Sequence, residues 1–596
     1  MRSSLLILAM AVLLTGASGC RTESRPAAPR SHPADATLKR VGDDFLAGRF
    51  EFRPLDGVAV GWHQYDGRFT VPDRDTLAAE LVRLKRVDAE LQTVDPAQLS
   101  PARRFDRQLL ELAVANARWG LEWQRAPWRN PMYYVGALDV SIYLKRNFKP
   151  LPERVRDMTA ILQRAPDLYR AAREQLDPVL PLPFVQTAIE TATGTAGFLE
   201  KDVAAFAAGA TEPAVRAGFE AANRVAVAET RSFVEWLRRT RLPRADGAFA
   251  VGREGYQVML RAEFIELAPE DILAVGMREL RAEQERFAAA AAEIDPGGKP
   301  IEVFRSMQAE HPTAANLLPQ TRRNLENIRQ FLIDRRIVTL PSDVRALVAE
   351  TLPPFRATSF ASMDTPGPFE TRATEAYYYV TPVEADWTPQ QAEEWLTAFN
   401  DYAVDVTSIH EAYPGHYTQF LALNASRAST LAKVTDSYPF IEGWAHYTEQ
   451  MMIEQGFGQP ANPATATPAE RVRAAKYRLE QSDEALLRLC RLCCSIQLHC
   501  QGMTVDQATR FFRENCYFEE KPARAEATRG TYDPGYLYYT LGKLMILKLR
   551  RDWQTQEGAD FTLQRFHDEV LRHGTPPLPL LRQVMLKNPR QWPNIL

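Results

Sequence analysis

The sequence lacks an excess of positive charge, and this absence argues against nucleic acid as a partner. Its 596 residues carry a formal net charge of −3 at pH 7, whereas proteins that bind nucleic acid usually carry a basic surface. No internal repeat is found. Apolar residues make up 45% of the chain and charged residues 25%, so the protein can bury a sizeable core. Its length suggests about two to four structural units.

The sequence also has few cysteines, six in all. Apart from Cys20, four of the remaining five fall between residues 490 and 500, where apolar residues recur at helical spacing. Adjacent cysteines point in different directions on a helix, which argues against a metal cage of four cysteines. An exported protein can oxidise some of its cysteines, but we expect buried small hydrophobes at Cys490, Cys493, Cys494 and Cys500.

A long hydrophobic segment is missing as well, because the apolar run at residues 5–14 is too short to span a bilayer. It follows Arg2 and precedes Ala17-Ser18-Gly19-Cys20, an order that is typical of a signal peptide. These four residues resemble a bacterial lipobox, with alanine in place of the usual leucine, in which the cysteine becomes the acylated N-terminus. We expect a lipoprotein signal peptide at residues 1–20, and the alternative is an ordinary secretory signal.

Residues 21–36 are rich in proline, serine and alanine and are expected to form a flexible tether. The expected location is therefore the cell envelope, on the periplasmic or outer-membrane side. The expected contact with the membrane is a lipid on Cys20.

Strand signals are rare, and helical patterns dominate the chain. Residues 373–383 are the clearest strand, because β-branched and aromatic residues cluster there. Prolines and a glycine mark residues 340–372 as an irregular connection. The expected fold is mainly α, with helical regions at 37–345 and 346–596 that can share one core and a small β element. The expected helices are residues 74–94, 101–118, 153–176, 189–208, 213–240, 268–294, 344–352, 388–404, 468–500, 504–515 and 534–552.

One cluster of polar residues stands out, the segment IHEAYPGHYTQF at residues 409–420. In the zinc motif H-E-x-x-H, the two histidines lie four positions apart on one face of a helix. Here His416 follows His410 by six positions, which on an unbroken helix is about 120° out of alignment. Pro414 and Gly415 favour a break, because proline removes a backbone donor and glycine reaches conformations closed to other residues. We therefore predict a local bulge that returns the second imidazole to the face of the first.

A third ligand is expected downstream, because a catalytic zinc site has three protein ligands and one open position. Glu442, in the helical segment IEGWAHYTE at residues 441–449, is the expected third ligand. His446, four residues later on the same face, is an alternative ligand, and Glu449 is a candidate to orient a ligating histidine. The sequence thus predicts one Zn²⁺ ion, a general base at Glu411 and the ligands His410, His416 and Glu442.

These motifs belong to a wider resemblance that covers most of the chain after the tether. The sequence resembles the bacterial proteins grouped as domain of unknown function 885, through VGWHQYDGRF (60–69), HEAYPGHYTQ (410–419), EGWAHYTE (442–449), TYDPGYLYYTLGK (531–543) and FHDEVLRHGTPPLPLLRQVM (566–585). The resemblance implies an exported, mostly helical, metallopeptidase-like protein. It also implies a zincin-like architecture related to helical zinc carboxypeptidases and oligopeptidases, with the metal in a groove between helical halves.

Two positions depart from the family pattern. Members of the family more often carry leucine at His446. The helix that reads R-L-V-x-D-T-G-x-H in relatives reads RLCCSIQLH at residues 491–499, so Ser495 stands in place of an expected aspartate. If that aspartate tunes the site, this protein differs from its relatives in rate or substrate.

A tetrahedral intermediate needs a hydrogen-bond donor or a positive group opposite the metal. Resemblance to zinc peptidases, in which a tyrosine or histidine has this role, favours Tyr539, with Arg529 and His499 as alternatives. Asp533 and Pro534 resemble a helix N-cap and first helical residue, which would fix the helix that carries Tyr539. The alternative for the tyrosines of this helix is an aromatic stripe in the core.

Two further segments admit a functional and a structural interpretation. His63, Asp66 and Arg68 either line the far wall of the groove or form a salt-bridged turn, and we favour the turn. Residues 377–380 either hold the substrate backbone along a sheet edge or close the core as a hairpin.

The expected activity is hydrolysis of short peptides, because a groove between helices excludes most folded proteins. In the expected chemistry zinc activates a water, and Glu411 takes its proton and passes it to the leaving amine. One alternative is a zinc hydrolase of a non-peptide or modified amino-acid amide, and another is a catalytically inactive binding lipoprotein. The glutamate beside the metal ligands argues against the inactive form.

Overall fold

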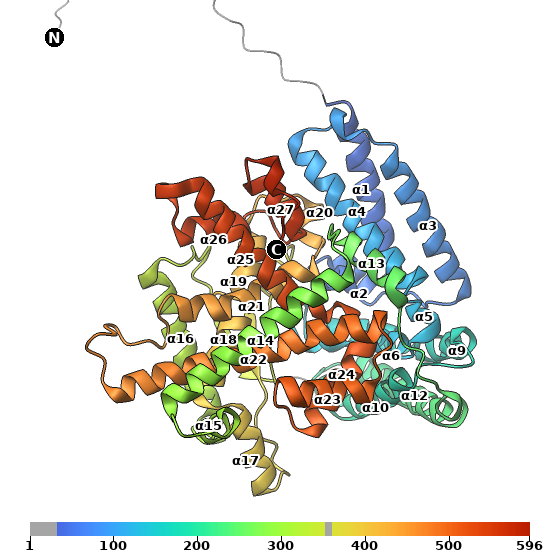
Figure 1. The fold of residues 1–596 in the computed structure, drawn as a ribbon. Coiled ribbons are helices and arrows are strands. Elements are labelled where there is room, and N and C mark those ends of the chain that lie inside the picture. The colour runs from blue at the N-terminus through green and yellow to red at the C-terminus, as the bar shows by residue number, and fades with distance from the viewer. Residues whose placement is uncertain (1–31, 352–359) are drawn as a thin grey trace, which may run out of the picture.

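The computed structural model describes residues 32–351 and 360–596, and it is mainly helical, as the sequence predicts (Figure 1). Within these two ranges, no helix is both long and apolar enough to cross a membrane.

The amino-terminal signal and tether fall largely outside this description. The expected signal peptide (1–20), its Cys20 and residues 21–31 of the tether are not among the described residues. The last tether residues differ from expectation, because the first helix already begins at Ala34. Asp35 in its first turn accepts a hydrogen bond of 2.9 Å from a backbone N–H at the start of α4, so this end of the chain belongs to the folded body.

The amino-terminal part is helical, and α1, α3 and α4 lie side by side at one end of the molecule (blue in Figure 1). Most of these helices match the segments with helical spacing. The main ones are α1 (Ala34–Phe52), α3 (Arg74–Gln92), α4 (Pro101–Glu122), α8 (Leu151–Leu162), α9 (Ala165–Gln175), α10 (Leu182–Phe198), α12 (Pro213–Trp236), α13 (Gly252–Ala262), α14 (Pro269–Ile294) and α16 (Leu317–Arg335).

The carboxyl-terminal part is also helical, and α22 begins at the predicted residue because a capping box closes its first turn. Thr467 accepts from the backbone of Glu470, and the side chain of Glu470 accepts in return. The helices are α17 (Pro389–Ala398), α18 (Asp401–Glu411), α19 (His416–Ala425), α20 (Thr430–Val434), α21 (Tyr438–Glu454), α22 (Pro468–Cys500), α23 (Val505–Asn515), α24 (Glu520–Tyr532), α25 (Tyr538–Glu557), α26 (Leu563–Leu571) and α27 (Leu578–Met585).

Two clusters of buried apolar side chains form the interior. One is built mainly from residues 38–237, and the other mainly from residues 249–595. The second cluster includes the packing of α14 against α22, which cross the middle of the molecule in Figure 1. The second cluster has members on both sides of residue 345.

A three-stranded sheet lies between the helical parts, in the order β1-β3-β2. β1 (Ala346–Glu350) runs parallel to β3 (Ala376–Val380), and β2 (Ala361–Asp364) runs antiparallel to it. β3 confirms the strand expected within residues 373–383. The prediction of a helix at residues 344–352 is wrong. This segment contains β1, in which side chains alternate between buried and exposed with the period of a strand.

The position of β3 also excludes one functional interpretation. Because β3 pairs on both sides, residues 377–380 have no free edge on which to hold a substrate backbone. Their side chains instead help to close the core, and the antiparallel β2–β3 pair corresponds to the expected hairpin. The outer strand on that side is β2, and its Met363 contacts the residue next to the first histidine of the polar cluster.

The amino-terminal part holds β2 in place through buried polar contacts. His63 lies between two carboxylates, at 3.1 Å from Asp66 and 2.9 Å from Glu370, in the segment between β2 and β3. Arg146, only 5% exposed, donates to Asp364 of β2 at 2.5 Å and to backbone carbonyls just before β3. Arg68 pairs with Glu51 at 2.9 Å, so the interpretation of His63, Asp66 and Arg68 as a salt-bridged turn is confirmed.

Two glycines allow α21 and α25 to cross in close contact. A Cβ atom added to Gly443 would lie 2.5 Å from the Cα of Gly542, and one added to Gly542 would lie 2.0 Å from the carbonyl oxygen of Pro439. Such separations are far below van der Waals contact, so only glycine fits at the crossing. The crossing sets the distance between the helix that carries Glu442 and the helix that carries Tyr539.

Replacing Gly542 with alanine is therefore expected to lower the free energy of unfolding by about 1–3 kcal/mol, because the two helix backbones must separate. Thermal or denaturant unfolding measures this loss. Gly218→Ala in α12 is the matched control, since no atom lies within 4 Å of the added Cβ, and it should be neutral or slightly stabilising. Equal stabilities of the two variants would contradict the tight crossing.

Candidate metal centre

The helix that begins at Asp401 breaks between the two histidines of the polar cluster. α18 ends at Glu411 and α19 begins at His416, so the predicted local bulge is a complete break between two helices. A Cβ atom at Gly415 would lie 1.7 Å from the carbonyl oxygen of His410, which leaves room only for glycine. The N–H of Gly415 donates instead to the carbonyl of Ile409 at 3.0 Å, and this turn places both imidazoles on one side.

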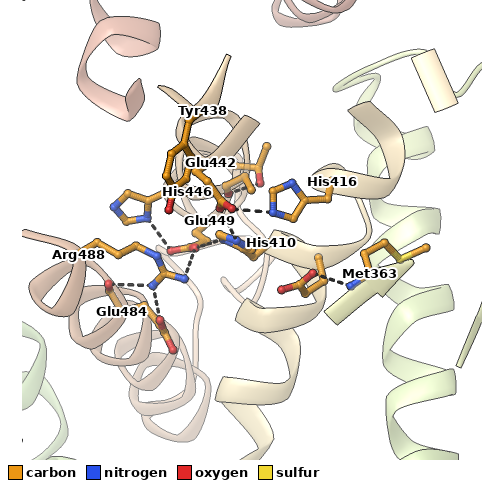
Figure 2. Close-up of polar contacts among 12 residues, drawn as sticks. Met363, His410, His416, Tyr438, Glu442, His446, Glu449, Glu484 and Arg488 are labelled. Atoms are coloured by element: carbon orange, nitrogen blue, oxygen red, sulfur yellow. Dashed lines mark hydrogen bonds and ion pairs between the residues drawn. The ribbon is translucent and has the colours of Figure 1, made fainter. Parts of the chain in front are cut away.

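Three side chains converge where α18, α19 and α21 meet (Figure 2). The Nε2 atom of His410 lies 3.6 Å from Oε2 of Glu442, and the Nε2 atom of His416 lies 3.5 Å from the same oxygen. One ligand atom of each residue lies within 4.8 Å of the others, and within the described ranges no other such group is found. The predicted residues His410, His416 and Glu442 are therefore brought together as a candidate metal site.

The distances fit coordination better than hydrogen bonding. They exceed the usual hydrogen-bond range of about 2.7–3.2 Å, but two ligands about 2.0–2.2 Å from a tetrahedral ion lie about 3.4 Å apart. Oε2 of Glu442 and Nδ1 of His416 are buried and have no hydrogen-bond partner among the described residues. An unpartnered buried carboxylate oxygen is costly, and a cation between the three residues would satisfy it.

The charges in the cluster point the same way. Burial opposes a charge on His410, but the nearby carboxylate of Glu442 and the hydrogen bond to Glu449 raise its pKa to about 9. Burial also opposes a charge on Glu442, but His416 and His410 hold the pKa of its carboxyl well below the usual range. The metal-free cluster therefore holds a proton on an imidazole beside a carboxylate, and a divalent cation can displace that proton.

Glu449 supports the first histidine from behind. Its Oε1 atom accepts a hydrogen bond of 2.6 Å from Nδ1 of His410, and its Oε2 atom accepts one of 3.0 Å from Nδ1 of His446. Arg488 lies 3.3 Å from the same carboxylate and pairs with Glu484 (Figure 2). Burial works against the charge on Glu449, but Arg488 and His446 hold its pKa well below the usual range.

This arrangement turns Nε2 of His410 toward Glu442 and fixes the ring, as a hydrogen-bonded carboxylate does for a ligating imidazole. His446 contacts Glu449 through Nδ1 and is fully buried. It does not belong to the group of converging ligand atoms.

Glu411 is the last residue of α18 and points toward the sheet. Its Oε2 atom accepts a hydrogen bond of 2.9 Å from the backbone N–H of Met363 in β2. A backbone donor at this distance fixes the direction of the carboxylate. The sequence predicts Glu411 as a general base, but it does not predict that Glu411 contacts an edge strand.

Two tyrosines and an arginine lie on the α25 side of the centre. The ring of Tyr539 stacks 6.5 Å from that of His410, and the ring of Tyr438 lies 5.9 Å from Tyr539. Arg529 lies 5.8 Å from the Tyr539 ring and donates to the hydroxyl of Tyr438 at 3.4 Å and to Asp533 at 3.0 Å. Burial raises the pKa of both tyrosines, so both hydroxyls stay protonated, and that of Tyr438 donates to Asp533 at 3.3 Å.

The predicted role of Asp533 as an N-cap is wrong. Its side chain makes no capping hydrogen bond, because it binds Arg529 and Tyr438 instead. Tyr438 was not found from the sequence, although it lies four residues before Glu442 on the same face of α21. Spacing on one helix is the signal that could have identified it.

His499 has a different environment from the other predicted site residues. Its Nδ1 atom accepts from the N–H of Val251 at 3.2 Å, and Nε2 donates to the carbonyl of Gly530 at 2.8 Å. Burial lowers its pKa to about 4, so it is a neutral imidazole with both nitrogens in use. Ser495 likewise donates to the carbonyl of Pro534 at 2.6 Å, and it anchors the turn before α25.

The cysteines behave as small apolar residues. All five in the described part are free thiols, and four of them are buried. Burial raises the pKa values of Cys490, Cys493, Cys494 and Cys500. None of them belongs to a group of converging ligand atoms in the described ranges.

The comparisons with known proteins agree with this fold. The model of a family described as "Bacterial protein of unknown function (DUF885)" matches residues 54–585. A solved structure from Shewanella oneidensis, described as a presumed lipoprotein of unknown function, is 23% identical, with 92% of this chain and 100% of that chain covered and a TM-score of 0.74. No curated protein is significantly similar to the sequence.

Two further solved structures are similar at lower identity. A presumed lipoprotein from Colwellia psychrerythraea is 16% identical, with 94% of this chain and 99% of that chain covered and a TM-score of 0.74. A carboxypeptidase from Pyrococcus furiosus is 9% identical, covers 93% of this chain and 96% of its own, and has a TM-score of 0.41, too remote to bear on function. The two lipoproteins show the fold that this chain shares.

Proposed function

We propose that this chain, which belongs to the DUF885 family of bacterial proteins, is a zinc-dependent peptidase that hydrolyses short peptides at the cell envelope. The observation that carries the proposal is the convergence of two imidazole nitrogens and one carboxylate oxygen, with a glutamate next to the first histidine. Because residues 17–20 resemble a lipobox, we propose that a lipid on Cys20 holds the protein to the membrane.

The donor set suits zinc, because His410, His416 and Glu442 supply two nitrogens and one oxygen and leave a fourth position open. A zinc ion held by these residues would supply Lewis-acid chemistry that activates water and polarises a carbonyl at neutral pH. Glu449 would keep the His410 ring in the tautomer that presents Nε2 to the metal.

The other residues of the centre have roles that follow from their positions. Glu411, held by the N–H of Met363, would take a proton from the attacking water and transfer it to the leaving amine. Tyr539, with Tyr438 and Arg529 beside it, would donate to the oxyanion of the tetrahedral intermediate, because these groups present protonated or positive atoms on one side. His499 has no place in this scheme, since both of its ring nitrogens bind backbone groups.

A substrate panel tests the proposal. Purified protein is assayed with unmodified tri- to hexapeptides and with N-acylated amino acids, before and after removal of metal by a chelator. The expected result is cleavage of short peptides that stops on metal removal and returns when zinc is added. Cleavage of the N-acylated amino acids alone would support the amidohydrolase alternative, and peptide cleavage that survives full metal removal would contradict the proposal.

Glu449→Gln is expected to weaken zinc binding by about 10–100-fold, because the charged acceptor behind His410 is lost while the shape of the side chain is kept. Competition with a zinc-binding dye measures the dissociation constant. The matched control is Glu454→Gln, on the same helix but in a surface ion pair with Arg550, and it should bind zinc as the unchanged protein does. An unaltered affinity in Glu449→Gln would show that this carboxylate does not support the site.

A further inference from the structure

A polar cavity lies where α16, α18 and α22 meet the loop that follows α21 (Figure 1). It occupies about 460 Å³, a volume within the range of about 300–1,000 Å³ that is typical of ligand pockets. The described residues that line it include none of the candidate metal centre. Its polar lining includes Asn324, Asn327, Asp401, Asp405, Glu470 and Arg473.

The helices around the cavity each present one polar face to it. Asn324 and Asn327 lie three positions apart on α16, and Asp401 and Asp405 lie four positions apart on α18. Residues at these spacings are neighbours on one side of a helix. Asp405 is the most deeply buried charged residue of the lining, with 6% of its surface exposed, whereas Arg473 is exposed. The cavity therefore leads from a solvated rim to a buried carboxylate.

The protein satisfies only one oxygen of the Asp405 carboxylate. Its Oδ2 atom accepts a hydrogen bond of 2.6 Å from the hydroxyl of Tyr477. Its Oδ1 atom is buried and has no hydrogen-bond partner among the described residues. Burial raises the pKa of this carboxyl to about 6, although Tyr477, Asn324 and Arg473 favour its charged form. Because a buried carboxylate oxygen without a donor is costly, a ligand that donates to Oδ1 would make a strong interaction.

The charge of the cavity favours a positive ligand. Three carboxylates line it, those of Asp401, Asp405 and Glu470, and Arg473 is the one cation among the described residues of the lining. Arg473 also interacts with the hydroxyl of Tyr477. The hydrogen bonds that the three carboxylates accept come from neutral side chains, which are Gln320, Tyr477 and Thr467 respectively.

A single divalent ion does not fit this distribution of carboxylates. Within the described ranges, the ligand atoms of the metal centre form the only group that converges closely enough to hold one ion. The occupant of the cavity must therefore bring hydrogen-bond donors together with its positive charge. A primary ammonium group does so, because it carries one charge and three donors.

We infer that this cavity binds a small primary amine, whose ammonium group donates to Oδ1 of Asp405 and to the carboxylate of Asp401. These two carboxylates share a face of α18, and the side-chain amide oxygens of Asn324 and Asn327 on α16 are further acceptors in the same lining. The inference does not depend on the proposed peptidase function, since the cavity and the metal centre share no residue among those described.

Isothermal titration with three probes of equal chain length tests the inference. Cadaverine has an ammonium group at each end, the corresponding pentanediol has a hydroxyl at each end, and glutarate has a carboxylate at each end. Cadaverine is expected to bind about tenfold or more tightly than the diol, because a charge-assisted hydrogen bond is stronger than a neutral one. Glutarate should not bind. Equal affinity for cadaverine and the diol, or no binding of cadaverine, would overturn the inference.

Variants of the two aspartates locate the bound amine. Asp405→Asn keeps the size of the side chain but loses its charge, so it is expected to remove the preference for cadaverine over the diol. Asp401→Asn should weaken the same preference, and it provides the test if Asp405→Asn folds poorly. The matched control is Asp334→Asn, on the exposed side of α16 where Asp334 binds Gln330, and it should leave the preference unchanged. A preference that survives both Asp405→Asn and Asp401→Asn would contradict the proposed site.

Titration with and without added zinc separates this cavity from the metal centre. The affinity for cadaverine should be the same in both conditions, because the two sites share no residue among those described. Binding that requires zinc would assign the amine to the metal centre and overturn the inference. Cadaverine binding with the expected preferences by a chain that cleaves no peptide would count against the peptidase function and support the amine site.

Discussion

Glu411→Gln is expected to lower the turnover of short peptides by about 10²–10⁴-fold while zinc binding stays close to that of the unchanged protein. Loss of a general base has an effect of this size. Glutamine fills the same volume but cannot take up the proton of the attacking water. Glu411 is not among the converging ligand atoms, so the metal site should remain intact. Steady-state kinetics and metal analysis on the same preparation separate the two effects.

The control for this variant is Glu394→Gln, an exposed glutamate of α17, which should leave turnover unchanged. If Glu411→Gln cleaved peptides at the original rate, the base would be another group. If it lost zinc as well as activity, Glu411 would have to be treated as part of the metal site.

His416→Ala is expected to reduce bound zinc from about one ion per chain to nearly none and to abolish peptide hydrolysis. The variant leaves two protein ligands where a catalytic zinc site has three, and zinc binding depends on the full set. The Nδ1 atom of the His416 ring has no hydrogen-bond partner among the described residues, so removing the ring breaks no hydrogen bond at that atom. Inductively coupled plasma mass spectrometry after gel filtration measures the metal content.

His573→Ala is the matched control, because this histidine pairs with Glu569 in α26 and belongs to no group of ligand atoms. It should keep both zinc and activity. A His416→Ala protein that retained one tightly bound zinc ion per chain would rule out the proposed coordination.

The candidate metal residues could be predicted because their signal is local. The spacing of His410 and His416 is wrong for one helix, and Pro414-Gly415 supplies the interruption that corrects it. The structure differs from this prediction only in the size of the interruption. The sequence predicts a bulge within one helix, whereas α18 ends and a separate helix, α19, begins. Glu442 could be predicted as a ligand although it lies far along the chain from the histidines, because the sequence of α21 has an obvious helical pattern.

The surroundings of the site could not be predicted in the same way, because they depend on contacts between distant segments. Arg488 reaches Glu449 from α22, and the N–H of Met363 reaches Glu411 from a strand of four residues. Residues 346–350 were expected to be helical because a short apolar run fits either period, and pairing with β3 decides the outcome. Asp533 stands where the sequence predicts an N-cap residue, but its carboxylate binds the guanidinium of Arg529 instead of capping the helix.

The contacts of Arg146 and His63 with the segment around β2 bear on how the protein can be divided. A fragment that begins at residue 346 would contain both imidazoles, Glu442 and Glu411. It would lack Arg146, the cation that binds Asp364 on the same strand as Met363. Such a fragment would leave Glu411, the proposed proton acceptor, attached to a loosely tethered strand. A split protein is therefore expected to regain turnover when the two pieces are co-expressed, and not from the piece with the candidate metal ligands alone.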